Sequence, residues 1–219
     1  MRVLACGDRA VLVEVDEPAQ VLPLRDALQA AAADRRLRFE ELVPAERTVL
    51  VRVPAGTDLA SLAGAARQVA GQVRGPAGPH PDGDTGPAGD VTVDVRYDGP
   101  DLAEVARLTG MGVDEVVAAH TGTAWTVAFC GFSPGFGYLR APGDPLAVPR
   151  RDSPRERVPA GSVALGGHFS AVYPQPSPGG WQLIGHTALT LWDADRDPPA
   201  LLAPGQRVRF RAVAAGVSR

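Results

Sequence analysis

The segment from Gly131 to Gly135 has the G-x-S-x-G spacing that places a nucleophilic serine on a sharp turn in many hydrolases. Such a turn stabilises an oxyanion with the backbone N–H of the residue after the serine, and here that residue is Pro134, which has none. We therefore expect no serine nucleophile. The segment instead predicts a rigid ligand-binding loop walled by Phe132, in which Gly135 and Gly137 allow close approach, or else a purely structural turn.

A second motif is rich in arginine and lies between Pro149 and Pro159. Guanidinium groups on a stiff backbone suit a carboxylate or phosphate, because little entropy is lost when two hydrogen bonds form. A solvated basic loop is the alternative. The segment 161–167 is glycine-rich and could approach an anion through backbone amides, although it lacks a Walker sequence. The arginines concerned are Arg150, Arg151, Arg155 and Arg157.

The tryptophan, histidine and cysteine residues give weaker indications of a binding or catalytic role. Trp181 could stack on a ligand or fill the interior of the fold. Cys6 and Cys130 flank apolar residues and are expected to be buried, unpaired thiols. Outside the linker, the histidines show no metal-ligand spacing, so we expect no metal site, while one of them could act as a general base. These histidines are His120, His168 and His186.

Composition limits the chemistry and the partners. The chain contains no lysine, so any ATP phosphates must be held by arginines, backbone amides, a metal ion or a partner. The formal net charge is −3 with both signs mixed along the chain, which favours neither nucleic acid nor an anionic membrane as partner. No secretory signal and no run of about 18 apolar residues is recognised, so we expect a cytoplasmic protein.

The elements that must position these residues differ between the two halves of the chain. Hydrophobic periodicity predicts the order β-α-β-β-α, with strands over 10–15, 37–43 and 48–53 and helices over 19–33 and 59–73. A Gly/Pro-rich loop follows over 75–90. A strand over 91–97 would then close a ferredoxin-like β-α-β-β-α-β domain over 1–98, or would instead open the second domain.

The second half predicts a compact β-barrel over 99–219 and so an α+β fold. Two short helices come first, and Asp101 with Glu104 resembles a capping box at the start of the first of them. Short apolar runs broken by Gly and Pro favour a barrel over a parallel sheet, which would need intervening helices. The strands are expected over 126–129, 163–165, 170–173, 182–184, 189–192 and 208–213.

Several ordered motifs together resemble the family of 5-oxoprolinase B subunits, also labelled allophanate hydrolase subunit 1, which includes an inhibitor of a sporulation histidine kinase. They span 7–10, 44–51, 132–139, 149–150, 154–155, 158–163, 173–174, 177–185, 198–199 and 204–205. The sequence departs from the family pattern at Gly137, His186 and Gln206, where proline, arginine and aspartate are usual. The resemblance implies a ferredoxin-like N-terminal domain and a cyclophilin-like C-terminal barrel.

The resemblance also implies a function. The chain would act with two further 5-oxoprolinase subunits, the carboxyltransferase-like C subunit and the A subunit, to convert 5-oxoproline to glutamate. The reaction would use ATP with a divalent metal such as magnesium, bound here or only in the complex. The implied catalytic residues are His120, Arg150 and Arg155. The implied substrate-binding residues are Phe132, Pro134, Gly135, Ser162, Trp181 and His186.

Other functions remain open at this point. Allophanate or another urea-derived amide is an alternative substrate within the same family. A non-enzymatic inhibitor of a histidine kinase is an alternative of a different class. A prolyl isomerase would rest on fold analogy alone.

Overall fold

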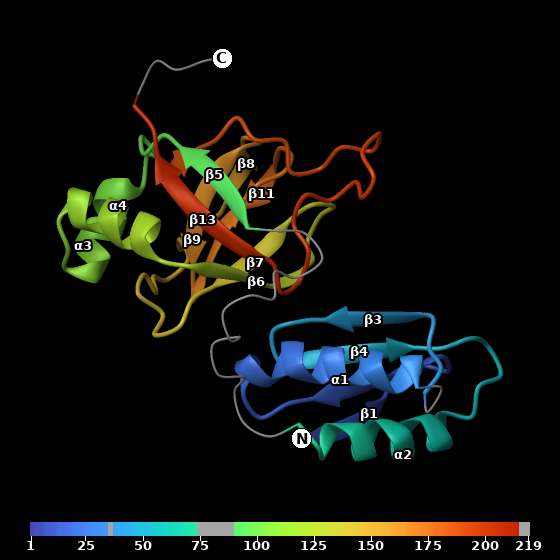
Figure 1. Cartoon of the computed structure of the whole chain (residues 1–219). Helices are drawn as coiled ribbons and strands as arrows, with labels where there is room; N and C mark the ends of the chain where they lie inside the picture. The colour runs from blue at the N-terminus through green and yellow to red at the C-terminus, as the bar shows by residue number, and fades with distance from the viewer. Residues whose placement is uncertain (35–36, 74–89, 215–219) are drawn as a thin grey trace. The chain divides into compact units, whose positions relative to one another are not determined.

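The computed structural model describes residues 1–34, 37–73 and 90–214 (Figure 1). The chain divides into two compact units, Met1–Asp84 and Thr85–Arg219. All of the predicted Gly/Pro-rich loop except its last residue lies outside the described residues. None of the helices in the described ranges is long and apolar enough to cross a membrane.

The first unit is a four-stranded antiparallel sheet in the order β1-β2-β4-β3, with α1 and α2 packed against it. Helix α1 buries Leu24 and Leu28 at helical spacing, and Val13 and Val49 come from paired strands to meet them. This unit therefore has its own core. Its elements are β1 (Arg2–Ala5), β2 (Ala10–Glu14), α1 (Val21–Ala33), β3 (Glu41–Pro44), β4 (Thr48–Arg52) and α2 (Leu59–Ala70).

The prediction that residues 91–97 form the closing strand of this unit is wrong. The strand found at Val91–Val95, β5, pairs in parallel with a strand of the second unit, so the first domain does not extend to residue 98. The edge of the sheet beside β2 is taken instead by β1, which the sequence analysis missed because it has only four residues and little burial. The ferredoxin-like assignment is not confirmed, and the alternative that residues 91–97 open the second domain is the correct one.

The second unit is built on one seven-stranded sheet in the order β12-β9-β10-β7-β6-β13-β5. Its two edges meet where Arg96, just after β5, exchanges two backbone hydrogen bonds of 2.9 Å with His186 of β12. The sheet is thus a nearly closed barrel, and the α+β class is confirmed. The elements are β5, α3 (Leu102–Thr109), α4 (Val113–Gly122), β6 (Trp125–Cys130), β7 (Gly137–Arg140), β8 (Arg155–Val158), β9 (Ser162–Gly166), β10 (Phe169–Val172), β11 (Ser177–Gly179), β12 (Gln182–His186) and β13 (Arg207–Ala212).

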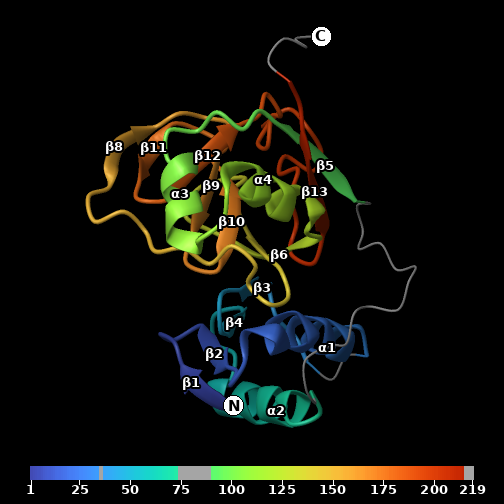
Figure 2. The same cartoon turned by 90° about the vertical axis from the view of Figure 1, so that its left-hand side faces the viewer.

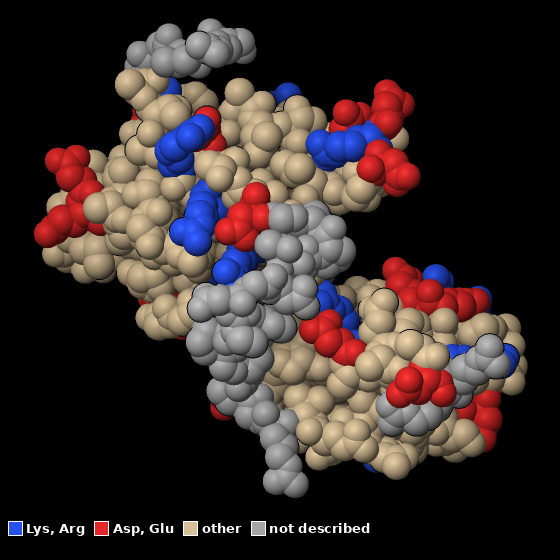
Figure 3. All heavy atoms as spheres, viewed as in Figure 1, with Lys and Arg blue, Asp and Glu red and all other residues tan. Residues whose placement is uncertain are grey.

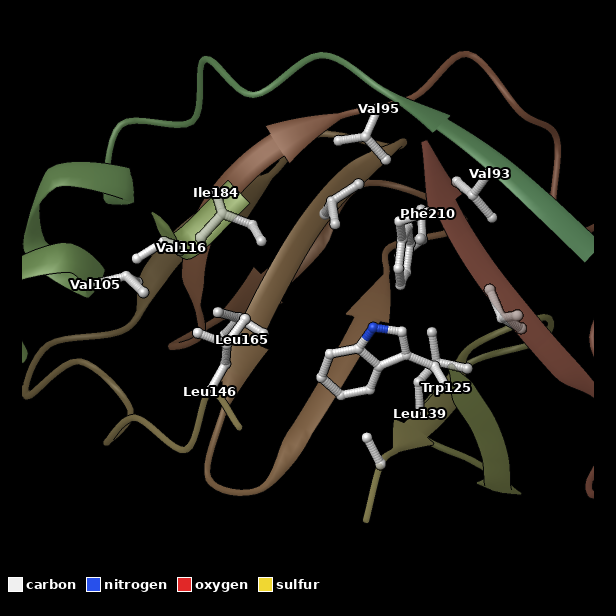
Figure 4. Packing of buried hydrophobic residues seen from close by; sticks show 14 of the residues in the cluster. Val93, Val95, Val105, Val116, Trp125, Leu139, Leu146, Leu165, Ile184 and Phe210 are labelled. Atoms are coloured by element: carbon white, nitrogen blue, oxygen red, sulfur yellow. The ribbon is translucent and has the colours of Figure 1, made fainter. Parts of the chain in front are cut away.

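The barrel interior is closely filled by apolar side chains (Figure 4). Trp125 and Phe210 lie edge to face with ring centroids 6.4 Å apart. Helices α3 and α4 pack against β12 and β13 and add Val105 and Val116 to the same core (Figure 2). A filled interior leaves the outer face of the barrel for any ligand.

Three strands of this unit, β7, β8 and β11, were not predicted, and residues 189–192 form no strand. β11 contains Pro178 and Gly179, and β8 lies in the arginine-rich segment, so neither has an apolar alternation. On the faces shown in Figure 3, basic and acidic side chains are interspersed rather than gathered into a patch of one sign.

Candidate functional site

The outer side of the barrel sheet carries a cluster of aromatic rings, most of which are buried. Successive residues of a strand point to opposite faces, so Leu139 and Ile184 pack inside while their neighbours Tyr138 and Leu183 lie outside. The ring of Trp181 is 5.6 Å from that of Tyr138, between centroids. We call this surface the aromatic face; its rings are Phe129, Phe136, Tyr138, Phe169, Tyr173 and Trp181.

The loop from Gly131 to Phe136 lies at the rim of the aromatic face. Phe132 is 62% exposed, and its ring packs edge to face on Phe136 at 5.3 Å. Its φ of 69° is unusual for an aromatic residue and costs energy. The Oγ of Ser133 is buried without a hydrogen-bond partner, so no base activates it, in agreement with the exclusion of a serine nucleophile.

Gly135 and Gly137 lie against packed side chains. A Cβ at Gly135 would lie 2.8 Å from the Cβ of Trp192, and φ at Gly135 is +79°. A Cβ at Gly137 would lie 3.2 Å from Leu202 Cδ1, which also limits the space for the proline usual there. Gly135 is buried, so of the three residues in this loop predicted to bind substrate only Phe132 and Pro134 are exposed.

The arginine loop, residues 149–155, crosses one end of the aromatic face. The Cζ of Arg150 lies 5.9 Å from the centre of the Trp181 ring, and Arg150 is exposed. Burial raises the pKa of Tyr138, and the positive charge of Arg150 opposes that shift. The exposed cation of Arg150 therefore lies near the partly buried Tyr138 and the buried ring of Trp181.

Arg155 is engaged differently from the prediction. Its Nη2 donates to Asp101 Oδ1 at 2.7 Å, and Arg151 Nη1 donates to the same oxygen at 3.0 Å. Because Asp101 is buried, both guanidinium groups are committed to an internal ion pair. The contact with Asp101 gives Arg155, which is 23% exposed, a structural role, and its catalytic role stays a prediction.

Asp101 is the residue of this site that the sequence analysis misread. Its spacing from Glu104 predicted a capping box, but its side chain makes no cap hydrogen bond. The arginines that bind it lie 50 and 54 residues away, so only the fold brings them together.

His120 is a core residue and is not placed for catalysis. It is fully buried, with Nδ1 2.7 Å from Tyr97 Oη and Nε2 2.8 Å from Ser170 Oγ. Burial lowers the pKa of His120 to about 3, so the ring is neutral at physiological pH. With both nitrogens bonded inside the barrel, the ring has no access to substrate, which argues against the catalytic role that the resemblance implied for His120.

The remaining predicted residues are dispersed. Ser162 is buried in β9, and Trp181 is buried in the aromatic face rather than inside the barrel. His186 is at the opposite end of β12 from Trp181, where its Nδ1 lies 2.8 Å from Asp98 Oδ1. Ring contacts link Phe132 through Phe136 to Trp181, near Arg150, whereas His120 and His186 lie elsewhere.

The two cysteines are unpaired, as predicted, but only one is shielded. Cys6 is exposed, contrary to the prediction, whereas Cys130 is partly buried. Burial raises the pKa of Cys130 to about 11, which leaves it a thiol.

The glycine-rich segment 161–167 does not form the anion-binding backbone cradle that its sequence made possible. The amides of Gly161 and Gly167 donate to the carbonyls of Tyr173 and Val148, so the 161–167 segment is a strand with turns and presents no open cradle. Within the described ranges, no group of three His, Cys, Asp or Glu side chains could hold a metal ion.

The family of the chain follows from its match to known sequences. The family model "Carboxyltransferase domain, subdomain C and D" matches residues 1–202. The chain belongs to this carboxyltransferase-domain family. The aromatic face, the arginine loop and Asp101 all lie within the matched residues of this carboxyltransferase-domain chain.

Two curated relatives show which kind of protein the chain resembles within this family. A protein named as the B subunit of 5-oxoprolinase from Escherichia coli O157:H7 is 54% identical over 112 residues, 51% of each chain. One of the same name from Bacillus subtilis (strain 168) is 46% identical over 112 residues, 51% of this chain and 47% of its own length. The match thus spans about half the length of these relatives. The resemblance to 5-oxoprolinase B subunits is confirmed.

Solved structures agree on the architecture. TTHA0988 is 30% identical with a TM-score of 0.70, over 96% of this chain and 41% of its own. The K. lactis urea amidolyase has a TM-score of 0.75 at 18% identity, over 96% of this chain and 15% of its own. At that identity the likeness to the amidolyase shows the fold alone.

Proposed function

We propose that this chain is the B subunit of an ATP-dependent 5-oxoprolinase, acting with the C and A subunits to convert 5-oxoproline to glutamate. The observation that carries this proposal is the 54% identity to the Escherichia coli protein of that name. Under this proposal the chain is part of a hydrolase and is inactive alone.

The site of Arg150, Tyr138 and Trp181 suits this substrate. 5-Oxoproline is a small ring with one carboxylate, and an exposed guanidinium can bind a carboxylate through two parallel hydrogen bonds. The partly buried ring of Tyr138 offers an apolar surface to the lactam ring, and the buried ring of Trp181 lies near the guanidinium of Arg150. We assign Arg150 to the carboxylate, with Phe132 and Pro134 at the exposed rim beside it.

The ring-opening chemistry is assigned to the complex. His120 is buried and neutral, Arg155 is paired with Asp101, and Ser133 has no base, so these side chains supply neither a nucleophile nor a proton relay. We propose that the partner subunits hold ATP and its divalent metal, and that this chain binds and orients the substrate.

The test is glutamate release and ATP hydrolysis from 5-oxoproline, with this chain and candidate C and A subunits tested singly and in all combinations. We expect activity only when this chain is present. Arg150→Ala should raise KM at least about 10-fold, as expected when one charged hydrogen-bonding partner of a substrate is removed. Arg107→Ala, which removes an exposed arginine paired with Glu104 on the same helix, is the matched control and should leave KM unchanged.

Other outcomes separate the alternatives. If a stable complex forms that is inactive on 5-oxoproline and active on allophanate, allophanate replaces 5-oxoproline as the proposed substrate. The absence of any complex with the C and A subunits would favour the histidine-kinase inhibitor instead.

A further inference from the structure

Asp101 is a buried carboxylate that the proposed function does not use directly. Its side chain is 5% exposed, and both of its oxygens are engaged. Oδ1 accepts from Arg151 and Arg155 at 3.0 and 2.7 Å, and Oδ2 accepts from the backbone N–H of Leu183 at 2.7 Å. One side chain therefore joins the start of α3, the arginine loop and β12.

The arginine loop is fixed to β12 by further bonds on either side of Arg150. The Arg151 N–H donates to the carbonyl of Gly180 at 2.7 Å, and Gln182 Nε2 donates to the carbonyl of Pro149 at 3.2 Å. Arg150 thus lies between two residues whose backbones are held, and its side chain projects over Trp181.

The ion pairs of Asp101 stabilise the observed position of the arginine loop. If the two arginines moved away, Asp101 would remain buried without a counter-charge, which is strongly unfavourable. The arginine loop therefore has one favoured position, and a preorganised guanidinium loses little entropy when it binds an anion.

We propose that Asp101 is a positioning residue that fixes the arginine loop, so that Arg150 is held over Trp181 to receive the carboxylate of the substrate. The role of the loop in substrate binding rests on the proposed function. The fixing of the loop by Asp101 does not, and it is measured separately.

The first test is proteolysis of Asp101→Asn. An asparagine can accept the Leu183 N–H bond through its single oxygen, but its NH2 group then faces two guanidinium donors. Since the chain has no lysine, trypsin can cut only at arginines. We expect cleavage after Arg150 and Arg151 to accelerate by about 10-fold or more as the loop opens locally, with cleavage elsewhere unchanged.

The control is Glu104→Gln, which removes a carboxylate from an exposed arginine pair in the same helix. It should leave cleavage of the arginine loop at the wild-type rate. If Asp101→Asn does not fold, Arg151→Gln replaces it, because that variant keeps the Asp101–Arg155 pair. It should show faster cleavage after Arg150, by a smaller factor.

The second test uses the reconstituted complex. We expect Asp101→Asn to raise KM for 5-oxoproline by about 10-fold while kcat changes less than about 2-fold, since binding is weakened and the chemistry lies in the partners. Mere destabilisation of the chain would lower the amount of active complex and leave KM unchanged.

The outcomes decide between the two proposals. Wild-type cleavage of the loop in folded Asp101→Asn and Arg151→Gln would overturn the positioning role. A loosened loop with unchanged KM in an active complex would overturn its link to substrate binding. A loosened loop with no activity from the wild-type complex would remove the proposed function and leave the fixing of the loop standing.

Discussion

His120, which the family resemblance implied to be catalytic, stacks on Phe210 with ring centroids 4.2 Å apart and bonds to Tyr97 and Ser170. Its true partners lie 23 and 50 residues away, so only the fold could show that both ring nitrogens are satisfied.

His120 should make the stability of the protein depend on pH. The pKa of His120 falls from 6.5 in an exposed chain to about 3 when folded, so the unfolded state binds the proton more tightly. The free energy of unfolding should therefore decline as pH falls below 6.5, by about 1.4 kcal/mol per pH unit from this group. Urea unfolding of wild type and His120→Gln at pH 7 and 5 measures it.

The His120→Gln variant should be less stable than the wild type at pH 7, but its free energy of unfolding should fall less between pH 7 and pH 5. His168→Gln is the control, because His168 is 54% exposed and paired with Asp144 at the surface. Equal pH dependence in wild type and His120→Gln would contradict the buried, neutral histidine.

Gly135 was expected to make room for a ligand, but it makes room for Trp192 and Leu191. Gly135→Ala adds both a left-handed strain and a contact of 2.8 Å. We expect it to lower the free energy of unfolding by about 3 kcal/mol, the sum of strain and overpacking. Gly110→Ala, with φ +70° and open space around it, should cost only about 1–2 kcal/mol, for strain alone. Equal losses in denaturant unfolding would contradict the packing role.

Elements with a clear periodicity were predicted within a few residues of their observed bounds. Helix α1 and strand β4 are examples, since each has a buried apolar face that repeats at the helical or strand period. The strands β7 and β11 could not be found in this way, because they have only four and three residues and contain glycine or proline, so they show little apolar alternation. The arginine loop was recognised, but which arginine stays free depends on Asp101.

The bridge between Arg96 and His186, which closes the barrel between β5 and β12, gives a testable prediction; we call this bridge the seam. A Cβ at Gly185 in β12 would clash with the carbonyl oxygen of Arg96, within the bridge that closes the sheet. Gly185→Ala should open this seam and cost at least about 2 kcal/mol by overpacking. Hydrogen exchange of the Arg96 and His186 amides should accelerate more than exchange elsewhere in the barrel.

Gly122→Ala is the control for this substitution, because nothing lies within 4 Å of its Cβ position at the end of α4. It should change stability by less than about 1 kcal/mol and leave the seam amides protected. Protected seam amides in Gly185→Ala would show that the bridge tolerates the methyl group.

The division of the molecule depends on where β5 belongs. The apolar alternation of residues 91–97 was read correctly as a strand, but a strand pattern does not identify its partner. β5 pairs with β13, more than a hundred residues later, and places Val93 and Val95 in the barrel interior. The order of elements along the chain therefore suggested that β5 completes a ferredoxin-like first domain, whereas it pairs with β13 of the barrel.

Two fragments test this division. Residues 90–219 contain the whole barrel, and residues 99–219 start at the boundary first predicted. The shorter fragment loses β5, one of the two strands that pair with β13, and with it two valines that are 0% exposed. Burying them contributes about 3–6 kcal/mol together, a large part of the about 5–15 kcal/mol that stabilises a typical domain. By circular dichroism and thermal unfolding, 90–219 should melt cooperatively, whereas 99–219 should be largely unfolded or aggregated. Equal stability of the two fragments would place β5 outside the barrel core.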